Sequence, residues 1–354
     1  MGRGPLRQPF KRAAGAATVP GNRPGCAAAS LTLGLLVGLA AIPAVSAGPV
    51  EAQSDLDALL SYVADWVAAG HGEDEAPHLV ELAVAAGRDP ATWPPTHPAL
   101  DLLQAHIEER QGNSLIYQLR PAYALALAGR LDAEGNLTQR ILAGYQGGQF
   151  GTPGVFNDDM WSLIALGAAG VPQSDERVQG AAEALLAAQD VRGAWSWVEG
   201  GTGETDMTAM ALHALAAVGR MNATVAKRGL DFIGDETYPD GGVPLARPGA
   251  GNCDSTSWSI RAHALAEKPV PPKAWEFLRA LRHDDGSFRS TPGRPDTNIL
   301  CTLAAGATLG WALQKDWGMD GYGPAASKAP AGSAILCIAA LALPAIGRKA
   351  LSAP

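Results

Sequence analysis

Two kinds of apolar stretch alternate along the chain from about residue 55 to residue 310. One kind is rich in Ala and Leu and nearly free of charge, as in LVELAVAAG and ALHALAAVG. The other is apolar on one side only, because Val178, Ala181, Ala182 and Leu185 recur at helical spacing among charged residues. The pattern predicts helix pairs, with amphipathic members at about 55–68, 98–110, 137–144, 176–189, 224–233 and 272–282.

The charge-free stretches end at intervals of roughly 40 to 50 residues, a period typical of repeat architectures. Their ends are predicted at Gly87, Gly129, Gly170, Gly219, Glu267 and Gly310. Each unit supplies one charge-free and one amphipathic helix, and the small side chains of the former suit a tight inner ring. We therefore expect an all-α toroid of six outer and six inner helices.

The turns between units also repeat. Asp-Gly or Gly-Gly provides positive φ, and the apolar residue that follows is expected to fill the gap between neighbouring units. These apolar residues are Phe150, Trp195, Val243 and Phe288. A polar residue then opens each inner helix as an N-cap. The predicted caps, all at one end of the ring, are Asn157, Asp206, Asp254 and Asp296.

The two ends of the chain differ from its body, which we place at residues 48–320. Residues 1–47 begin with a basic, acid-free segment, continue with an apolar run and end in small residues, as in a secretory signal peptide. An uncleaved anchor is the alternative. After a linker at 321–332, the uncharged segment 333–347 is followed by Arg348 and Lys349, which predicts a membrane anchor with a cytoplasmic end. A buried helix is the alternative, because Pro344 and the short length weaken a span.

Composition narrows the range of partners. The net charge of -8 argues against nucleic acid, whose phosphates need a basic face. Cys253 and Cys301 fall in the body, and we expect two buried thiols rather than a disulfide bridge. Export and anchoring together place the protein at the cell surface, attached to the cytoplasmic membrane.

The repeats between residues 146 and 310, with the Asp-Met-Thr-Ala-Met-Ala-Leu helix start at Asp206, resemble those of squalene and terpenoid cyclases and protein prenyltransferases. Exported members of this repeat type without an assigned activity are the most similar. The resemblance implies the same toroid. Squalene cyclases protonate their substrate from the middle Asp of an Asp-x-Asp-Asp run, and the nearest match here is Asn157-Asp158-Asp159. Asp158 and Asp159 are therefore the candidate acids, although stabilisation of a helix start explains them better.

Other chemistry of these families is poorly matched. Prenyltransferases hold zinc with Asp, Cys and His, but Cys253 and Asp254 have no His at the corresponding place, so we expect no metal or other cofactor. Aromatic residues make up only 6% of the chain, which gives little support to carbocation chemistry.

The candidate ligand site is a cavity at the end of the ring where the inner helices begin. Its predicted residues are Asn157, Trp161, Trp195, Trp197, Asp206, His213, Asp254, Trp258 and Asp296. The favoured function is an exported, membrane-anchored toroid that binds a small apolar or mixed ligand, or a cell-surface partner, without established catalysis. The alternative is a divergent terpenoid cyclase or prenyltransferase-like enzyme acting on an isoprenoid or lipid. A carbohydrate-active enzyme is a third, weaker hypothesis, and it would need paired carboxylates.

Overall fold

A computed structural model describes residues 47–323, except 111–113, 132–133 and 320. The predicted signal peptide, apart from its last residue, and the predicted membrane anchor lie outside the described residues. Within the described part, no helix combines the length and the apolar character needed to cross a membrane.

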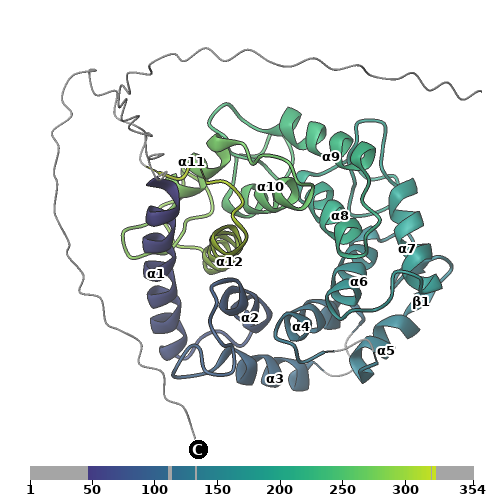
Figure 1. The fold of residues 1–354 in the computed structure, drawn as a ribbon, viewed down its shortest axis with the longest axis horizontal. Coiled ribbons are helices and arrows are strands. Elements are labelled where there is room, and N and C mark those ends of the chain that lie inside the picture. Colours follow the sequence, from purple (N-terminus) through teal and green to yellow (C-terminus); the bar gives the residue numbers. More distant parts are fainter. Residues whose placement is uncertain (1–46, 111–113, 132–133, 320, 324–354) are drawn as a thin grey trace, which may run out of the picture. The chain divides into compact units, whose positions relative to one another are not determined.

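Helices of the described chain alternate between an inner and an outer ring (Figure 1). The inner helices are α2 (Ala76–Ala85), α4 (Ile116–Leu127), α6 (Phe156–Ala168), α8 (Thr205–Ala217), α10 (Cys253–Leu265) and α12 (Ile299–Lys315). The outer helices are α1 (Ala47–Ala68), α3 (Ala99–Glu109), α5 (Asn136–Ala143), α7 (Glu176–Ala187), α9 (Ala223–Glu236) and α11 (Pro272–Ala280). The prediction of an all-α toroid with six inner and six outer helices is confirmed.

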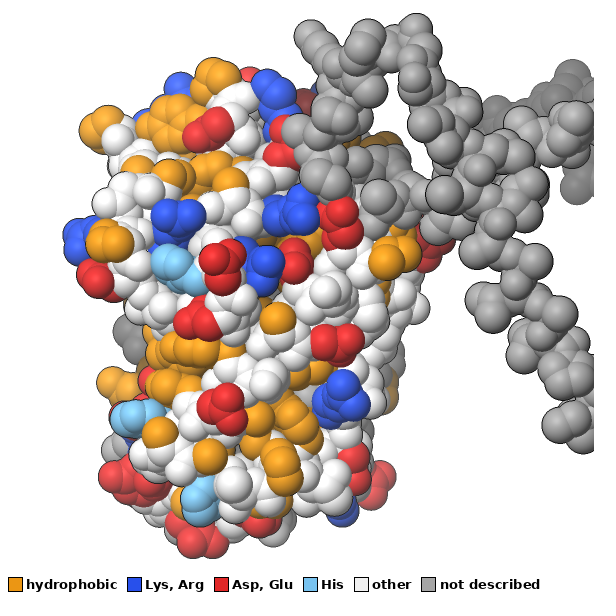
Figure 2. Space-filling view, turned by 90° about the vertical axis from the view of Figure 1, so that its left-hand side faces the viewer, with side chains coloured by type: hydrophobic (Ala, Val, Ile, Leu, Met, Phe, Trp, Pro, Cys, Tyr) orange, Lys and Arg blue, Asp and Glu red, His pale blue; other side chains and the backbone are white. Residues whose placement is uncertain are grey.

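Each inner helix packs against the next one, and α12 packs against α2, so the inner ring is closed. The inner helices are buried on most sides, as their lack of charge predicts. In α8, for example, every residue from Met207 to Leu212 is buried. The outer helices leave their charged faces in solvent. On the side of the ring that Figure 2 shows, acidic and basic side chains are interspersed among apolar ones, and neither sign gathers into one patch.

Positive φ angles end five of the six inner helices where the sequence predicts. Gly87, Gly129, Gly170 and Gly219 have φ between 64° and 76°, and Glu267 has φ 54°. The sixth prediction is wrong: Gly310 lies inside α12, and the left-handed residue is Asp316 at φ 51°.

Packing explains Gly310. A Cβ at this position would lie 2.4 Å from the carbonyl oxygen of Ala85, so the glycine lets α12 approach α2 where the ring closes.

The turns that follow the outer helices α5, α7, α9 and α11 are each held by the same kind of hydrogen bond. The apolar turn residues Phe150, Trp195, Val243 and Phe288 are fully buried between units, as predicted. Each donates its backbone N–H to the side chain of the fourth residue of the next inner helix. The acceptors are Asp159 (2.6 Å), Thr208 (3.1 Å), Thr256 (3.1 Å) and Thr302 (2.9 Å). In the first of these turns, β1 (Tyr145–Gln146) pairs antiparallel with β2 (Gln149–Phe150).

Candidate functional site

A cavity of about 570 Å³ opens at the end of the ring where the inner helices begin, and we call it the front cavity. The second residues of five inner helices line it: Pro77, Tyr117, Asn157, Asp206 and Asp254. One helical turn deeper it is lined by the sixth residues Pro121, Trp161, Met210 and Trp258. Residues four apart share one helix face, so the cavity is lined by the same face of successive inner helices.

The predicted N-cap role of the polar residues is wrong. The residues before α6 and α8 are Val155 and Glu204, and neither makes a side-chain cap. Asn252 and Asn298 cap α10 and α12. A cap needs a non-helical backbone ahead of the first turn, whereas Asn157, Asp206 and Asp254 are already inside their helices. Their side chains line the front cavity instead.

Three other predicted site residues lie elsewhere. Asp296 is exposed two residues before the cap Asn298 and does not line the front cavity. The residue of α12 that corresponds to Asp206 is Leu300. Trp195 is buried between units, where its Nε1–H donates to the carbonyl of Leu185 over 2.7 Å, and it lines neither end of the ring. His213 lies toward the opposite end of the ring, where the inner helices finish. By contrast, Trp197 lies at the mouth of the front cavity.

Asp206 and Asp254 form an acidic pair on the wall made by α8 and α10. Burial, followed by the nearby Asp254 charge, raises the pKa of Asp206 to about 7. Burial also raises the pKa of Asp254, but Arg120 and Arg261 oppose that rise by favouring its charged form. The two carboxyls therefore titrate as a coupled pair, in which Arg120 and Arg261 favour the charged form of Asp254.

Arg120 faces the front cavity from α4. Its guanidinium donates to Nε2 of His78 and lies 4.6 Å from the ring centre of Trp161. Burial lowers the pKa of His78 well below its ordinary value, so this imidazole is neutral and accepts through Nε2. No ion pair of Arg120 with a carboxylate lies within 4.0 Å among the described residues, although Glu81 and Asp254 are its nearby acidic groups.

The floor of the front cavity is aromatic. Trp161 contacts Trp258 edge to face at 6.0 Å between ring centres, and both rings contact the pair formed by Tyr123 and His213 behind them. Tyr123 and His213 belong to a second cavity of about 230 Å³ at the end of the ring where the inner helices finish. These four rings therefore separate the two cavities. Burial lowers the pKa of His213 to about 4, so it is neutral at ordinary pH.

The candidate acids Asp158 and Asp159 are not among the residues that line the front cavity. Asp158 accepts the backbone N–H of Thr152 at 3.0 Å. Asp159 accepts from the backbone of Phe150 at 2.6 Å and from the Nε2 of Gln149 at 2.8 Å. Burial raises the pKa of Asp159 to about 6. Both carboxyls thus hold the turn ahead of α6, and Asp159 takes the place that Thr occupies in later units.

The two cysteines of the body are buried free thiols, as predicted, and Cys253 Sγ donates to the carbonyl of Cys301 at 3.4 Å. His263 also lies on α10, and its Nδ1 contacts the carbonyl of Ser259 at 2.9 Å. In the portion of the chain that the structure describes, no group of three or more His, Cys, Asp or Glu is placed to hold a metal ion.

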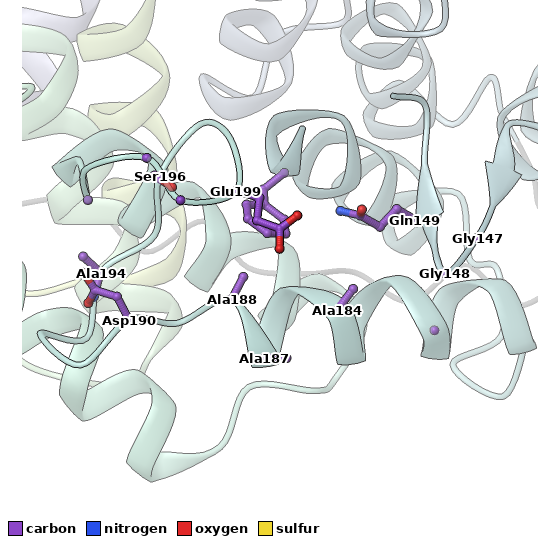
Figure 3. Close-up of a pocket in the computed structure, with 15 residues that line it drawn as sticks. Gly147, Gly148, Gln149, Ala184, Ala187, Ala188, Asp190, Ala194, Ser196 and Glu199 are labelled. Atoms are coloured by element: carbon purple, nitrogen blue, oxygen red, sulfur yellow. The ribbon is translucent and has the colours of Figure 1, made fainter. Parts of the chain in front are cut away.

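A third hollow, of about 510 Å³, lies outside the inner ring between α7 and the neighbouring turns. Figure 3 shows Ala184 and Ala188 on the face of α7 that is turned toward Gln149 and Glu199. Both ends of the Gln149 amide are already bonded, to Asp159 and to the backbone of Gly154. The hollow is lined mostly by Gly and Ala, which offer few side-chain groups that could bind a ligand specifically. The front cavity is therefore the candidate site.

Several residues of the front cavity escaped sequence reasoning. Pro77, His78, Tyr117 and Arg120 come from α2 and α4, whose units lack the repeated turn that aligned the later ones. Met210 could have been found, because it is four residues after Asp206, as Trp258 is four residues after Asp254.

No protein-family model matches the chain, and no curated protein sequence matches it. Among solved structures, the type II terpene cyclase MstE from Scytonema in its apo form is similar with a TM-score of 0.52 and 14% identity, over 75% of this chain and 99% of that one. A variant of it in complex with geranylgeranyl dihydroxybenzoate, described as its substrate, gives 0.53 and 13%, with 75% and 99% covered. An ent-copalyl diphosphate synthase from Streptomyces platensis gives 0.48 and 18%, with 68% of this chain covered. This chain spans about half, 50%, of that synthase.

The likeness to the two MstE structures shows the fold. The chain has the α/α toroid architecture of type II terpene cyclases, as the repeat resemblance implies.

Proposed function

We propose that this toroid is a divergent terpenoid-cyclase-like enzyme, with an isoprenoid chain in the front cavity and Asp206 as the acid that protonates it. The observation that carries the proposal is a carboxyl with a pKa of about 7 on the wall of a cavity whose floor is Trp161 and Trp258. Type II terpene cyclases with the same architecture act on such chains, as the geranylgeranyl compound bound to the MstE variant illustrates.

The chemistry needs an acid that still carries its proton at neutral pH. Asp206 meets this need because Asp254, supported by Arg120, takes the negative charge of the pair. The proton passes from the Asp206 carboxyl to one carbon of a double bond and leaves a cation on the other. The next double bond attacks that cation and closes a ring. Loss of a C–H proton to water ends the sequence, and Asp206 regains a proton from water.

The two tryptophans support the cation on this route. An indole face stabilises positive charge within about 6 Å. Both rings already lie near a guanidinium of the protein, and Arg120 lies over Trp161 at 4.6 Å from its ring centre. Arg261 lies 5.4 Å from the Trp258 ring centre. The remaining cavity-facing surface of each ring is what a substrate cation would contact.

The test is product formation by the full chain, supplied with squalene or geranylgeraniol in detergent and analysed by gas chromatography and mass spectrometry for cyclic isomers of unchanged mass. Asp206→Asn should lower the rate by about 10²-fold or more, the usual contribution of a general acid. Asp159→Thr is the matched control, because Thr makes the same turn hydrogen bond in three other units. It should leave the rate unchanged.

Each other outcome has a definite meaning. Full activity in Asp206→Asn would show that Asp206 is not the acid. Loss of activity in a folded Asp159→Thr variant would point to Asp159 as the acid instead. Saturable binding without any product would instead support a ligand-binding toroid, the function favoured by the sequence.

A further inference from the structure

The cavity of about 230 Å³ at the end of the ring where the inner helices finish is large enough for a small molecule, and we call it the back cavity. Its apolar lining includes the aliphatic side chains of Leu127, Ile164 and Leu265 and the indole rings of Trp311 and Trp317. An engineered apolar cavity of about 150 Å³ binds benzene. The back cavity therefore has room for one ring that carries a small substituent.

The side chains with nitrogen or oxygen that line the back cavity can all donate a hydrogen bond. They are Tyr123, His213, Arg261, Trp311, Lys315 and Trp317. In the described part of the chain, this lining contains no carboxylate, no side-chain amide and no Ser or Thr hydroxyl. Such a lining complements a ligand group that accepts hydrogen bonds and donates none.

His213 has a nitrogen that the fold leaves without a partner. Its Nδ1 is buried and makes no hydrogen bond with any described residue. Burial lowers the pKa of this imidazole to about 4, so the ring is neutral and carries a single N–H. Buried N–H groups without an acceptor are rare in proteins, so we assign the proton to Nε2. The Nε2–H is then the donor that His213 offers to the cavity it lines.

Lys315 supplies an unpaired positive charge at the edge of the back cavity. Its Nζ lies 5.2 Å from the ring centre of Trp311, and it forms no ion pair with a described residue. Arg261, the other cation of the lining, is already paired with Glu81 over 2.7 Å. After burial, the charges of Arg261 and Lys315 lower the pKa of His213 further, although Glu81 opposes them. The positive charge left for a ligand is therefore that of Lys315.

We infer that the back cavity is a binding site for a small carboxylate that carries a ring. The ring would lie against the indoles of Trp311 and Trp317, and the carboxylate would accept from Nζ of Lys315 at the mouth. The Nε2–H of His213 would donate to an acceptor oxygen of the ligand. Charge-assisted hydrogen bonds are among the stronger ones in proteins. Four aromatic rings separate this ligand from the front cavity, so the site does not rest on the proposed function.

The helix ends around the back cavity act in the opposite direction. The C-termini of the inner helices converge here, and their dipoles favour a cation over an anion. The closing turns reduce this effect, because the N–H groups of Gly129 and Gly170, for example, bond the carbonyls of Ala126 and Gly167. A cationic ligand of the same shape is therefore the decisive comparison for the charge that the cavity prefers.

The test is calorimetric titration of the full chain in detergent with benzoate, benzyl alcohol and benzylammonium, which share a ring and differ in charge. Benzoate should bind saturably below about 10 mM, and the other two at least roughly tenfold more weakly. Lys315→Met should lower the benzoate affinity about tenfold or more, and Lys315→Arg should retain most of it. Lys268→Met is the matched control, because this exposed lysine follows α10 at the same end of the ring and does not line the cavity. It should leave the affinity unchanged.

Ala168→Phe locates the ligand independently of charge. Ala168 is exposed and lines the back cavity, so a phenyl group there would occupy the space of the ligand ring without disturbing the core. This variant should lose benzoate binding. Benzoate binding that survives both Lys315→Met and Ala168→Phe would place the ligand elsewhere and overturn the proposal.

Equal or tighter binding of benzyl alcohol or benzylammonium would also overturn the proposal, as would the absence of benzoate binding. Asp206→Asn should bind benzoate as the unchanged chain does. Loss of cyclic product with intact benzoate binding therefore bears on the acid alone, and loss of benzoate binding with intact turnover bears on the back cavity alone.

Discussion

Arg261 on α10 donates to Glu81 on α2 over 2.7 Å, across the interior of the ring, and both side chains are buried. The same guanidinium donates to the hydroxyl of Thr308 at 2.9 Å and to the carbonyl of Ala304 at 3.2 Å, both on α12. One side chain thus connects the first inner helix to the last two. This cluster fastens the ring at its closure.

Breaking that pair should weaken the fold strongly. Glu81→Gln leaves Arg261 buried without a counter-charge, which typically costs about 3–5 kcal/mol of the free energy of unfolding. The exposed pair of Lys227 and Asp231 is the control, since Lys227→Met should cost about 0–1 kcal/mol. Urea unfolding of the full chain measures both. Equal losses in the two variants would mean that the Arg261 cluster does not fasten the ring.

Two glycines within helices should respond to alanine in opposite directions. Gly310→Ala places a Cβ 2.4 Å from the Ala85 carbonyl oxygen and should destabilise the junction of α12 and α2 by about 1–3 kcal/mol. Gly234 lies within α9, and a Cβ there meets nothing within 4 Å. Gly234→Ala should therefore stabilise the chain by about 0.5–1 kcal/mol. Thermal unfolding distinguishes them, and a harmless Gly310→Ala would show that the two helices can separate freely.

Stability should fall with rising pH through the Asp206 carboxyl. Its pKa of about 7 in the folded state lies above the ordinary 3.8, so the folded chain holds this proton more tightly than the unfolded chain. Stability is then fully present below about pH 4 and is lost progressively until about pH 7. Asp206→Asn removes this dependence, and relative to it the unchanged chain should lose on the order of 2–4 kcal/mol across that window.

Denaturant unfolding of both proteins at pH 4 and at pH 8 measures the difference. Asp159 titrates in both proteins and cancels on subtraction, whereas Asp254 interacts with Asp206, so the difference between the two curves reports the titration of this pair. A difference independent of pH would show that Asp206 is not shifted in the folded state.

The sequence predicts the ring well because the ring depends on features that repeat. Charge-free and amphipathic helices alternate, glycines end the inner helices, and buried residues such as Phe150 and Trp195 fill the gaps. A single copy of any of these features would be weak evidence for a ring, but the copies recur at similar spacing along the chain. Gly310 was misinterpreted because an interior glycine required by a neighbouring backbone looks the same in sequence as one that ends a helix.

The candidate site was harder to predict, because a shift of a few residues along a helix changes the face that a side chain occupies. Asp296 precedes α12 by three residues and is exposed, while Asp206 is one residue inside α8 and lines the cavity. The two look equivalent in sequence because each is an acidic residue that follows a repeated turn. They differ in the structure because the distance from each residue to the start of its helix is not the same. Arg120 and its contact with His78 could not be predicted, since they join side chains 42 residues apart from units without the repeated turn.

The hydroxyl of Tyr322 donates to Asp55 on α1 at 3.1 Å, and Gly48 lies against the backbone of Met319, so the first and last described segments pack together. Because these two segments are neighbours, the units could be connected in a different order along the chain and still pack in the same order around the ring. A chain joined at these ends and opened at an exposed turn such as 199–202 would present the same neighbours to every helix. The packing of the helices in the ring therefore does not depend on which unit comes first in the chain.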